Sequence, residues 1–437
     1  MYALVDGNNF YVSCERAFRP SLKNRPVIVL SNNDGCAIAR SNEAKALGIA
    51  MGAPWFKIKH MAETDGVVAL SANFVLYGDM SDRMMSIAAG LGPSQEIYSI
   101  DESFIDLTGV AGDQVARAHN VRERILQWIG IPTGIGIGPT KTLAKLANHI
   151  AKSADRKPGS YPAELARVCH LGAMSAAELE AVLAATEVRE VWGVGPRIAA
   201  QLEAEGITTV LQLTQLDPAT VRRRWSVVLE RTVRELQGQP CVSLDDQPAP
   251  KKEIAYTRSF GGAVTELGDL VAAVTRFASG AAVKLRAQGS RAGQLMVFAH
   301  TSPFRPGPKY SRSITVPLRR PTADTMDLVH AATLGMRAIY RPGFNFAKAG
   351  VMLMDLQSNA IEQSELPLDL ETKLETTASP RSQLMGALDH LNGRYGRGTV
   401  QVGSAGVKGP RRNWEMKQSL LTPQYTTNWQ DVPVARA

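Results

Sequence analysis

Three acidic residues stand where short apolar runs end, and their carboxylates could hold metal ions. Asp101 and Glu102 lie between two such runs, and Asp6 ends a third, residues 2–5. The runs have the length and β-favouring residues of strands, so the adjacent acids are expected at the bend of a hairpin. If the strands are neighbours in one sheet, the carboxylates meet at one edge and repel one another unless cations lie among them. Such an all-oxygen ligand set suits Mg²⁺, and paired metals support in-line phosphoryl transfer.

The simpler interpretation is a solvated turn, because an Asp-Glu pair in a hairpin usually has no other role. The neighbourhood of Asp6 favours the metal interpretation. Gly7 has no Cβ, so its backbone carbonyl could approach a metal ion. Phe10 and Tyr11 follow and could form the floor of a sugar pocket, although core packing is the more common role of two such aromatics.

The elements that would position the acids alternate between strand and helix. Strands are expected at 2–5, 97–100, 103–107 and 133–137, and helices at 114–128 and 140–152. This order predicts a βαββαβ-like domain. The glycines of 133–138 have the wrong spacing for a dinucleotide or phosphate loop, so this run is expected to be a buried strand crowded by neighbouring backbone.

The remaining chain predicts further domains, because 437 residues exceed one core and roughly three domains are expected. The segment 166–239 is helical and punctuated by glycines, and 240–252 has the prolines and charges of a linker. Strands and helices in 253–356 repeat the βαββαβ order. The tail from 357 changes character, and its stretch 393–417 combines basic residues with Trp414, which could contact nucleic acid or a partner protein.

Composition and charge limit the class of protein. The formal charge is +8, from 49 basic and 41 acidic residues, which suits a polyanionic partner but also suits solubility alone. The cysteines form no zinc pattern and no disulfide framework is expected, so buried small residues are their default role: Cys14, Cys36, Cys169 and Cys241. No signal peptide or membrane-spanning run is recognisable, so a cytoplasmic protein is expected.

Two motifs carry a resemblance to a known family. Asp6-x-x-x-Phe10-Tyr11-x-Ser13-x-Glu15, followed by Tyr98-Ser99-Ile100-Asp101-Glu102-Ser103-Phe104, resembles the Y-family DNA polymerases. The segments 31–36 and 42–48 look like the UmuC branch, the catalytic subunits of DNA polymerase V, and the similarity covers essentially the whole chain.

The resemblance implies an α+β, multidomain, right-hand polymerase. Its parts would be a ferredoxin-like palm at 1–15 and 76–165, fingers at 16–75, a helical thumb with a helix-hairpin-helix at 166–239, a linker at 240–252, a βαββαβ little finger at 253–356, and a tail at 357–437 with a clamp-binding-like peptide and a basic partner-binding module.

The resemblance also implies roles for the residues near the acids. Asp6 and Asp101 would bridge two Mg²⁺ ions, Glu102 would complete the shell, and Gly7 would offer its carbonyl. Tyr11 matches the position of the family's steric gate, where the ring would block a 2′-hydroxyl. Phe10 would support the sugar.

Three further residues match positions that contact the triphosphate in the family. Lys152 matches the triphosphate lysine. Asn42 and Lys45 stand where relatives commonly place a Tyr and an Arg. Lys45 keeps the positive charge without the bidentate geometry, so triphosphate affinity is expected to differ.

Two weaker motifs concern DNA and partners. Gly193 and Gly195 lie in a loop that resembles a helix-hairpin-helix, whose amides would hold a DNA backbone phosphate, and a generic helical hairpin is equally consistent with it. Gln363, Leu366 and Leu368 resemble a sliding-clamp peptide without its final aromatic, and a plain linker is nearly as consistent.

The expected function is that of an error-prone translesion DNA polymerase of the SOS response. By resemblance, its substrates are damaged primer-template DNA and dNTPs, and its partners are a processed UmuD dimer, RecA and the sliding clamp. Two alternatives stay open from the residues alone. One is a different two-metal enzyme, such as a nucleotide cyclase or nuclease, and a cyclase would need neither the thumb-like DNA hairpin nor the second basic domain. The other is a non-catalytic DNA-binding scaffold, which would bind DNA tightly without Mg²⁺-dependent extension.

Overall fold

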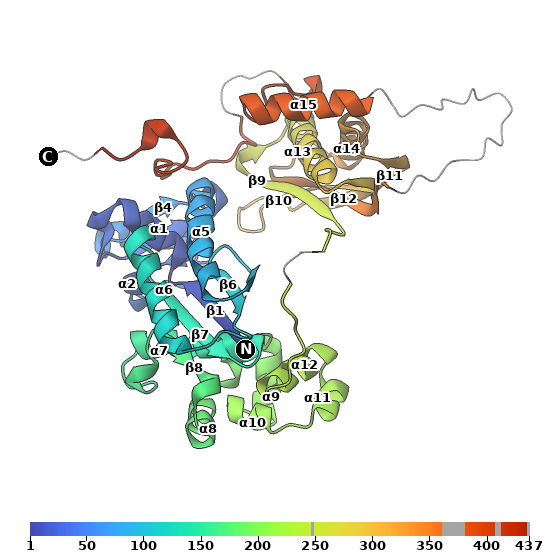
Figure 1. Ribbon diagram of the computed structural model, residues 1–437. Coiled ribbons are helices and arrows are strands. Elements are labelled where there is room, and N and C mark those ends of the chain that lie inside the picture. Colours follow the sequence, from blue (N-terminus) through green and yellow to red (C-terminus); the bar gives the residue numbers. More distant parts are fainter. Residues whose placement is uncertain (246–248, 361–380, 407–411, 435–437) are drawn as a thin grey trace. The chain divides into compact units, whose positions relative to one another are not determined.

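The computed structural model describes residues 1–245, 249–360, 381–406 and 412–434 (Figure 1). The chain divides into two compact units. The first is Met1–Ser31, Gly35–Pro248 and Leu420–Ala437, and the second is Asn32–Asp34 and Ala249–Ser419. Each unit has its own apolar core. The clamp-like residues Gln363, Leu366 and Leu368 lie outside the described residues.

A five-stranded sheet forms the centre of the first unit. Its strands, in spatial order, are β5 (Ser94–Ile97), β6 (Glu102–Asp106), β1 (Tyr2–Gly7), β7 (Thr133–Gly138) and β8 (Val168–His170). The strand β1 is antiparallel to both β6 and β7. Helices α5 (Phe74–Ala88), α6 (Gln114–Ile129) and α7 (Lys141–Arg156) pack against the sheet. The sheet extends past residue 165, the predicted end of the palm, because β8 pairs with β7.

Side chains of β1 and β6 alternate between the two faces of the sheet. Ala3 and Val5 belong to the core cluster that includes α5 and α6, whereas Leu4 and Phe104 pack with α7. Residues two apart on a strand share a face. Asp6 follows Leu4 by two positions and Glu102 precedes Phe104 by two, so both acids lie on the face that α7 covers.

The hairpin at the acids differs from the prediction, because the strand expected at 97–100 is wrong. The first strand, β5, ends at Ile97, and the next residues form a turn. The hydroxyl of Ser99 accepts hydrogen bonds from the amides of Asp101 (3.3 Å) and Glu102 (3.1 Å). These local side-chain bonds stabilise a turn in place of the ladder. Asp101 therefore lies in the turn, and Glu102 begins β6.

The glycine-rich run forms β7, as predicted, and α7 lies directly against it. All six residues of β7 are buried. A Cβ at Gly136 would lie 2.1 Å from the amide nitrogen of Asn148 and 2.3 Å from the carbonyl oxygen of Ala144. Only glycine allows this approach of strand and helix, which brings the polar face of α7 to the end of β1.

The segments on either side of the palm also fold as regular elements. Helix α1 (Phe10–Phe18) leads from the palm into the predicted fingers. The fingers hold the three-stranded sheet β3-β2-β4 and three short α-helices: β2 (Val27–Leu30), β3 (Ala37–Arg40), β4 (Val68–Ser71), α2 (Asn42–Ala46), α3 (Trp55–Ile58) and α4 (Met61–Thr64). The range of the predicted thumb holds five helices within 166–239: α8 (Ala176–Ala185), α9 (Pro196–Ala204), α10 (Val210–Thr214), α11 (Pro218–Arg224) and α12 (Val227–Leu236).

The second unit has the predicted βαββαβ order. Its elements are β9 (Ile254–Val264), α13 (Leu267–Ala287), β10 (Ser290–Thr301), β11 (Ser311–Thr322), α14 (Thr325–Ile339) and β12 (Phe346–Ser358). The strand order is β11-β10-β12-β9, so the first strand lies at the edge of this sheet, whereas β1 is internal in the palm. Helix α15 (Arg381–Tyr395) follows.

Trp414 is a core residue of the second unit, so the prediction that it contacts nucleic acid or a partner is wrong. It is 1% exposed and packs edge-on against Phe277 of α13. Its large apolar ring gains more from burial than from a place at the surface.

Both ends of the predicted linker 240–252 are hydrogen-bonded to folded elements. The amide of Asp245 donates to Glu96 of β5 at 2.6 Å. At the other end, Lys251 and Gln288 exchange two hydrogen bonds of 3.0 Å. Both anchors lie inside the compositional bounds of the linker.

The cysteines are all free. Cys14 and Cys169 are buried, as expected, whereas Cys36 and Cys241 are partly exposed. None of the helices in the described part of the chain has the length and apolar character that crossing a bilayer requires.

Candidate active site

The sheet register brings the three acids to one edge, as the sequence predicts. Asp6 of β1 is directly opposite Glu102 of β6. The amide of Gly7 donates to the backbone carbonyl of Asp101 at 2.8 Å, which fixes the turn beside the end of β1. The hydroxyl of Ser99 donates to Oδ1 of Asp101 at 2.6 Å.

Polar residues of α7 pair with these carboxylates. The Lys152 ammonium contacts Oδ1 of Asp6, and Nδ2 of Asn148 donates to Oδ2 of Asp6 at 2.9 Å. The Lys145 ammonium lies 2.7 Å from Oε2 of Glu102. Residues 145, 148 and 152 share one face of the helix because their spacing is three and then four.

The environment of Asp6 opposes the ionisation of its carboxyl group. The carboxylate is 7% exposed, and burial raises its pKa. The Lys152 ammonium opposes this rise, and the nearby Glu102 adds to it. A buried carboxylate beside a second acid stays ionised only with positive charge at hand, and the lysines supply that charge here.

The donor set fits Mg²⁺, although it is not a preformed cage. Among the described residues, no group of three or more Asp, Glu, His or Cys side chains is already arranged as a metal site. Two hard carboxylate groups on adjacent strands, with a third in the turn, match an ion that takes the rest of its shell from water and substrate phosphates.

Tyr11 lies beside the acids, and its ring packs against two aromatic rings of α5. It stacks on Tyr77 of α5, with ring centroids 4.6 Å apart and planes 17° apart, and meets Phe74 edge-on at 6.0 Å. Burial raises the pKa of Tyr11, and the negative charge of Asp101 adds to this shift. Phe10 is buried and packs against Tyr11, as the core-packing interpretation expects.

The predicted triphosphate residues of the fingers meet at Asn9. Its side chain accepts from the Lys45 ammonium and donates to Oδ1 of Asn42 at 3.0 Å. Burial lowers the pKa of Lys45 to about 8, and the positive charges of Arg156, Arg40 and Lys152 contribute. Cations this close together favour a polyanionic ligand.

Several residues of the site were not assigned to it from the sequence. They are Asn9, Arg40, Lys145, Asn148 and Arg156. The helical spacing of 145, 148 and 152 was a usable signal for the residues of α7. The two arginines and Asn9 come from separate elements, so no local pattern connects them.

The predicted DNA-binding loop packs against the acidic hairpin. The ring centroids of Trp192 and Tyr98 are 5.6 Å apart. The Lys145 ammonium lies over both rings, 4.6 Å from the centroid of Tyr98 and 5.4 Å from that of Trp192. Gly193 has a φ of +90°, which favours glycine, and Gly195 is the N-cap of α9. Their contact with DNA stays a prediction.

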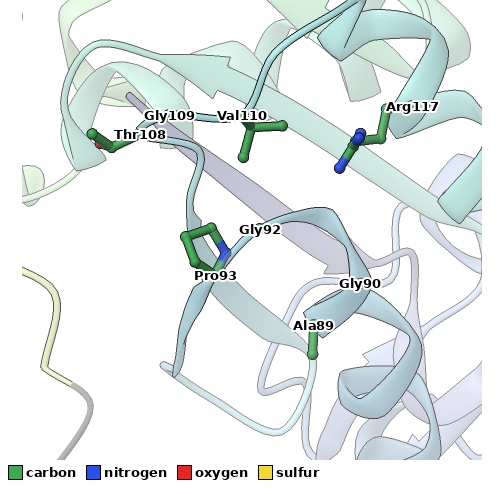
Figure 2. Close-up of a pocket in the computed structure, with 8 residues that line it drawn as sticks. All are labelled: Ala89, Gly90, Gly92, Pro93, Thr108, Gly109, Val110 and Arg117. Carbon is green, nitrogen blue, oxygen red and sulfur yellow. The ribbon is translucent and has the colours of Figure 1, made fainter.

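A pocket of about 550 Å³ lies beyond the opposite end of β6 from the acids (Figure 2). Figure 2 shows its lining residues on the segments 89–93 and 108–110, with the Arg117 side chain reaching from α6. None of the predicted site residues lines this pocket.

Comparisons with known proteins identify the family. The model of the impB/mucB/samB family matches residues 5–149, that of its C-terminal domain matches 251–366, and a domain of unknown function matches 382–435. Protein ImpB of Salmonella typhimurium is 43% identical over 100% of both chains, and Protein UmuC of Salmonella typhimurium strain LT2 is 42% identical over 99% of both. Protein MucB of Escherichia coli is 39% identical over 100% of this chain and 99% of its own.

The chain belongs to the impB/mucB/samB family, the UmuC branch of the Y-family DNA polymerases. It is a DNA-directed DNA polymerase of error-prone translesion synthesis in SOS mutagenesis. The family resemblance stated from the motifs is thus confirmed, and the cyclase, nuclease and scaffold alternatives fall away. Y-family polymerases use divalent metal ions and bind primer-template DNA and dNTPs.

Solved structures support the same fold. A Y-family DNA polymerase chimera of Dbh and Dpo4 superposes with a TM-score of 0.65 at 18% identity, over 82% of this chain and 99% of that one. DinB from Sulfolobus solfataricus gives a TM-score of 0.50 over 81% of this chain and 98% of its own. The predicted α+β polymerase architecture is confirmed at the level of fold.

Proposed function

We propose that this polymerase joins dNTPs to a primer 3′-hydroxyl, past damaged template bases, by two-metal-ion phosphoryl transfer at Asp6, Asp101 and Glu102. The observation that carries the proposal is the register of β1 and β6, which sets Asp6 opposite Glu102 with Asp101 in the adjoining turn. The ammonium groups of Lys152 and Lys145, which pair with two of these acids, support the proposal because they place positive charge at this edge.

The carboxylates of Asp6 and Asp101 would hold both Mg²⁺ ions, with Glu102 and the carbonyl of Gly7 completing the ligand set. When bound, the two ions lower the pKa of the primer hydroxyl and neutralise the triphosphate and the leaving pyrophosphate. The turn at Ser99 positions Asp101, because the Ser99 hydroxyl bonds its carboxylate.

The chain's cations orient the nucleotide. Lys152 and Lys45 would bind the triphosphate, with Asn42 held beside them through Asn9. Arg40 and Arg156 add positive potential at Lys45. Tyr11 would exclude a 2′-hydroxyl, and Phe10 supports its ring from the core.

Contacts with DNA and partners complete the proposal. The amides near Gly193 and Gly195 would hold the DNA backbone, and the βαββαβ unit would grip the duplex a second time. By family resemblance, the polymerase would work with a processed UmuD dimer, RecA and the sliding clamp, in the cytoplasm where its DNA lies. The clamp would be bound by Gln363, Leu366 and Leu368, outside the described residues.

The test is primer extension by Asp101→Asn, which removes a metal-binding charge without changing shape. We expect nucleotide addition to fall by about a thousandfold, because several kcal/mol of charge stabilisation are lost. Primer-template affinity should stay within about twofold, because Asp101 is not proposed to contact the DNA backbone. Asp106→Asn is the matched control, because this acid ends β6 away from the turn that holds Asp101 and accepts a hydrogen bond from the Thr108 amide.

Near-normal extension by Asp101→Asn would contradict the metal assignment. So would an equal loss in Asp106→Asn, which would show that the hairpin tolerates no change of charge anywhere.

A further inference from the structure

A segment near the C-terminus lies on helix α1, which carries Tyr11, and on the neighbouring elements β4 and α5. Residues 420–431, here called the C-terminal strap, belong to the first unit. The amide of Ser71 donates to the carbonyl of Leu420, and the amide of Leu420 donates to the Ser71 hydroxyl, both at 3.0 Å. Further along, the ring of Tyr425 stacks on Phe18 of α1 with centroids 4.7 Å apart.

Asn73 joins the strap to the start of α5. Its side-chain oxygen caps the helix. Its Nδ2 donates to the carbonyls of Thr422 and Pro423, each at 3.1 Å, and lies 3.2 Å from the Thr422 hydroxyl. Asn73 is 2% exposed, so these bonds are shielded from water. The helix it caps carries Phe74 and Tyr77, the rings against which Tyr11 packs.

A buried carboxylate connects the strap to the ring beneath Tyr11. Glu15 of α1 is fully buried, and its Oε1 accepts from the Tyr77 hydroxyl at 2.7 Å and from the Thr422 hydroxyl at 3.1 Å. Its Oε2 has no hydrogen-bond partner among the described residues. A buried carboxylate with so few donors depends on each of them.

We propose that Glu15 and Thr422 are positioning residues for sugar selection. They hold the Tyr77 ring, and through the aromatic stack they set where the Tyr11 ring lies. The inference rests on the proposed role of Tyr11 as the gate against a 2′-hydroxyl. A gate works by a clash of fractions of an ångström, so a small tilt of the supporting ring admits a ribonucleotide.

The experiment measures the ratio of kcat/KM for a dNTP to that for the matching rNTP, on one primer-template with the full chain. Thr422→Val removes the hydroxyl at nearly constant shape. We expect the ratio to fall by about three- to tenfold, the effect of one lost buried hydrogen bond. Thr422→Ser restores the hydroxyl and should restore the ratio.

Thr426→Val is the matched control within the strap. Its hydroxyl is buried and has no hydrogen-bond partner in the described part of the chain, so the ratio should not change. Asn73→Asp is the second variant, because aspartate still caps α5 but cannot donate to Thr422 and Pro423. It should also lower the ratio, while primer-template affinity stays constant in every variant.

Tyr11→Ala separates failure of the inference from failure of the proposed function. If Tyr11→Ala lowers the ratio sharply while Thr422→Val and Asn73→Asp leave it unchanged, the strap has no part in selection and the gate stands. An equal fall in Thr426→Val would also overturn the inference, because the effect would then be general to the segment. If Tyr11→Ala leaves the ratio unchanged, the gate assignment itself fails and the inference falls with it.

Discussion

Lys45 carries a positive charge that titrates within the working range of an enzyme. Its pKa is lowered to about 8, first by burial and then by neighbouring cations. A triphosphate binds the protonated form better, so binding raises this pKa, and affinity falls as pH rises through 8. We expect the KM for a dNTP to increase by up to about tenfold between pH 7 and pH 9, as the charged fraction of Lys45 falls.

The comparison is with Lys45→Arg, whose guanidinium stays charged across this range. Steady-state kinetics at several pH values should give a flatter KM profile for the variant. Equal slopes for both proteins would show that Lys45 does not bind the triphosphate.

At the scale of single residues, the sequence predicts which acids form the site but not which side chains pair with them. Strand-length runs ending in Asp6 and flanking Asp101 are a local signal, and the register confirms the meeting of these positions. The sequence alone does not assign Lys145 and Asn148 to the site, because a lysine-bearing helix usually faces water. Their stripe meets the acids only because Gly136 lets α7 approach the sheet, which is a tertiary effect.

At the scale of elements, the contact between β7 and α7 is the most sensitive to change. Gly136→Ala would place a methyl group 2.1 Å from the Asn148 amide nitrogen, so strand and helix must separate. We expect about 3 kcal/mol of lost stability in denaturant unfolding, together with lower activity because Asn148 and Lys152 move away from Asp6.

The control is Gly268→Ala in the first turn of α13, where an added Cβ meets nothing within 4 Å. This variant should be neutral or slightly more stable. Matching stabilities for the two variants would mean that the strand and helix separate without cost.

The elements themselves were largely predictable from periodicity and glycine placement. The buried glycine strand and the βαββαβ order of the second unit follow the sequence pattern. The strand expected at 97–100 was displaced because Ser99 offers its hydroxyl to two backbone amides, a competition that apolar runs do not reveal. The hydrogen bond from the Asp245 amide to Glu96 joins residues far apart in the chain, so no local sequence pattern predicts it.

At the scale of the whole molecule, the second unit is expected to fold alone. Its core is built from its own elements, and Trp414 is the one tryptophan within 249–419. A fragment of these residues should show blue-shifted Trp414 emission and unfold cooperatively in urea. Emission at the wavelength of exposed tryptophan, without a transition, would show that the core needs the rest of the chain.

The number of units was the least predictable feature. Length indicates roughly three domains, whereas the chain divides into two units because the thumb helices join the palm. The Thr140 hydroxyl donates to the carbonyl of Glu235 at 2.9 Å, and the Thr142 amide donates to its carboxylate at 2.9 Å. The C-terminal strap also joins the first unit through a long-range contact, and its contact is even less predictable. Thr422 and Asn73 are hydrogen-bonded although most of the sequence separates them.

The lysine pairs at the acids bear on how a metal ion would enter the proposed site. Asp6 and Glu102 each have an ammonium group beside them, so a free divalent ion that bound there would have to displace a lysine and leave it without a counter-charge. A nucleotide carrying its own ion would offer phosphate oxygens to the displaced lysines. If the acids are the metal ligands proposed above, we therefore expect metal and nucleotide to bind together more readily than the metal alone.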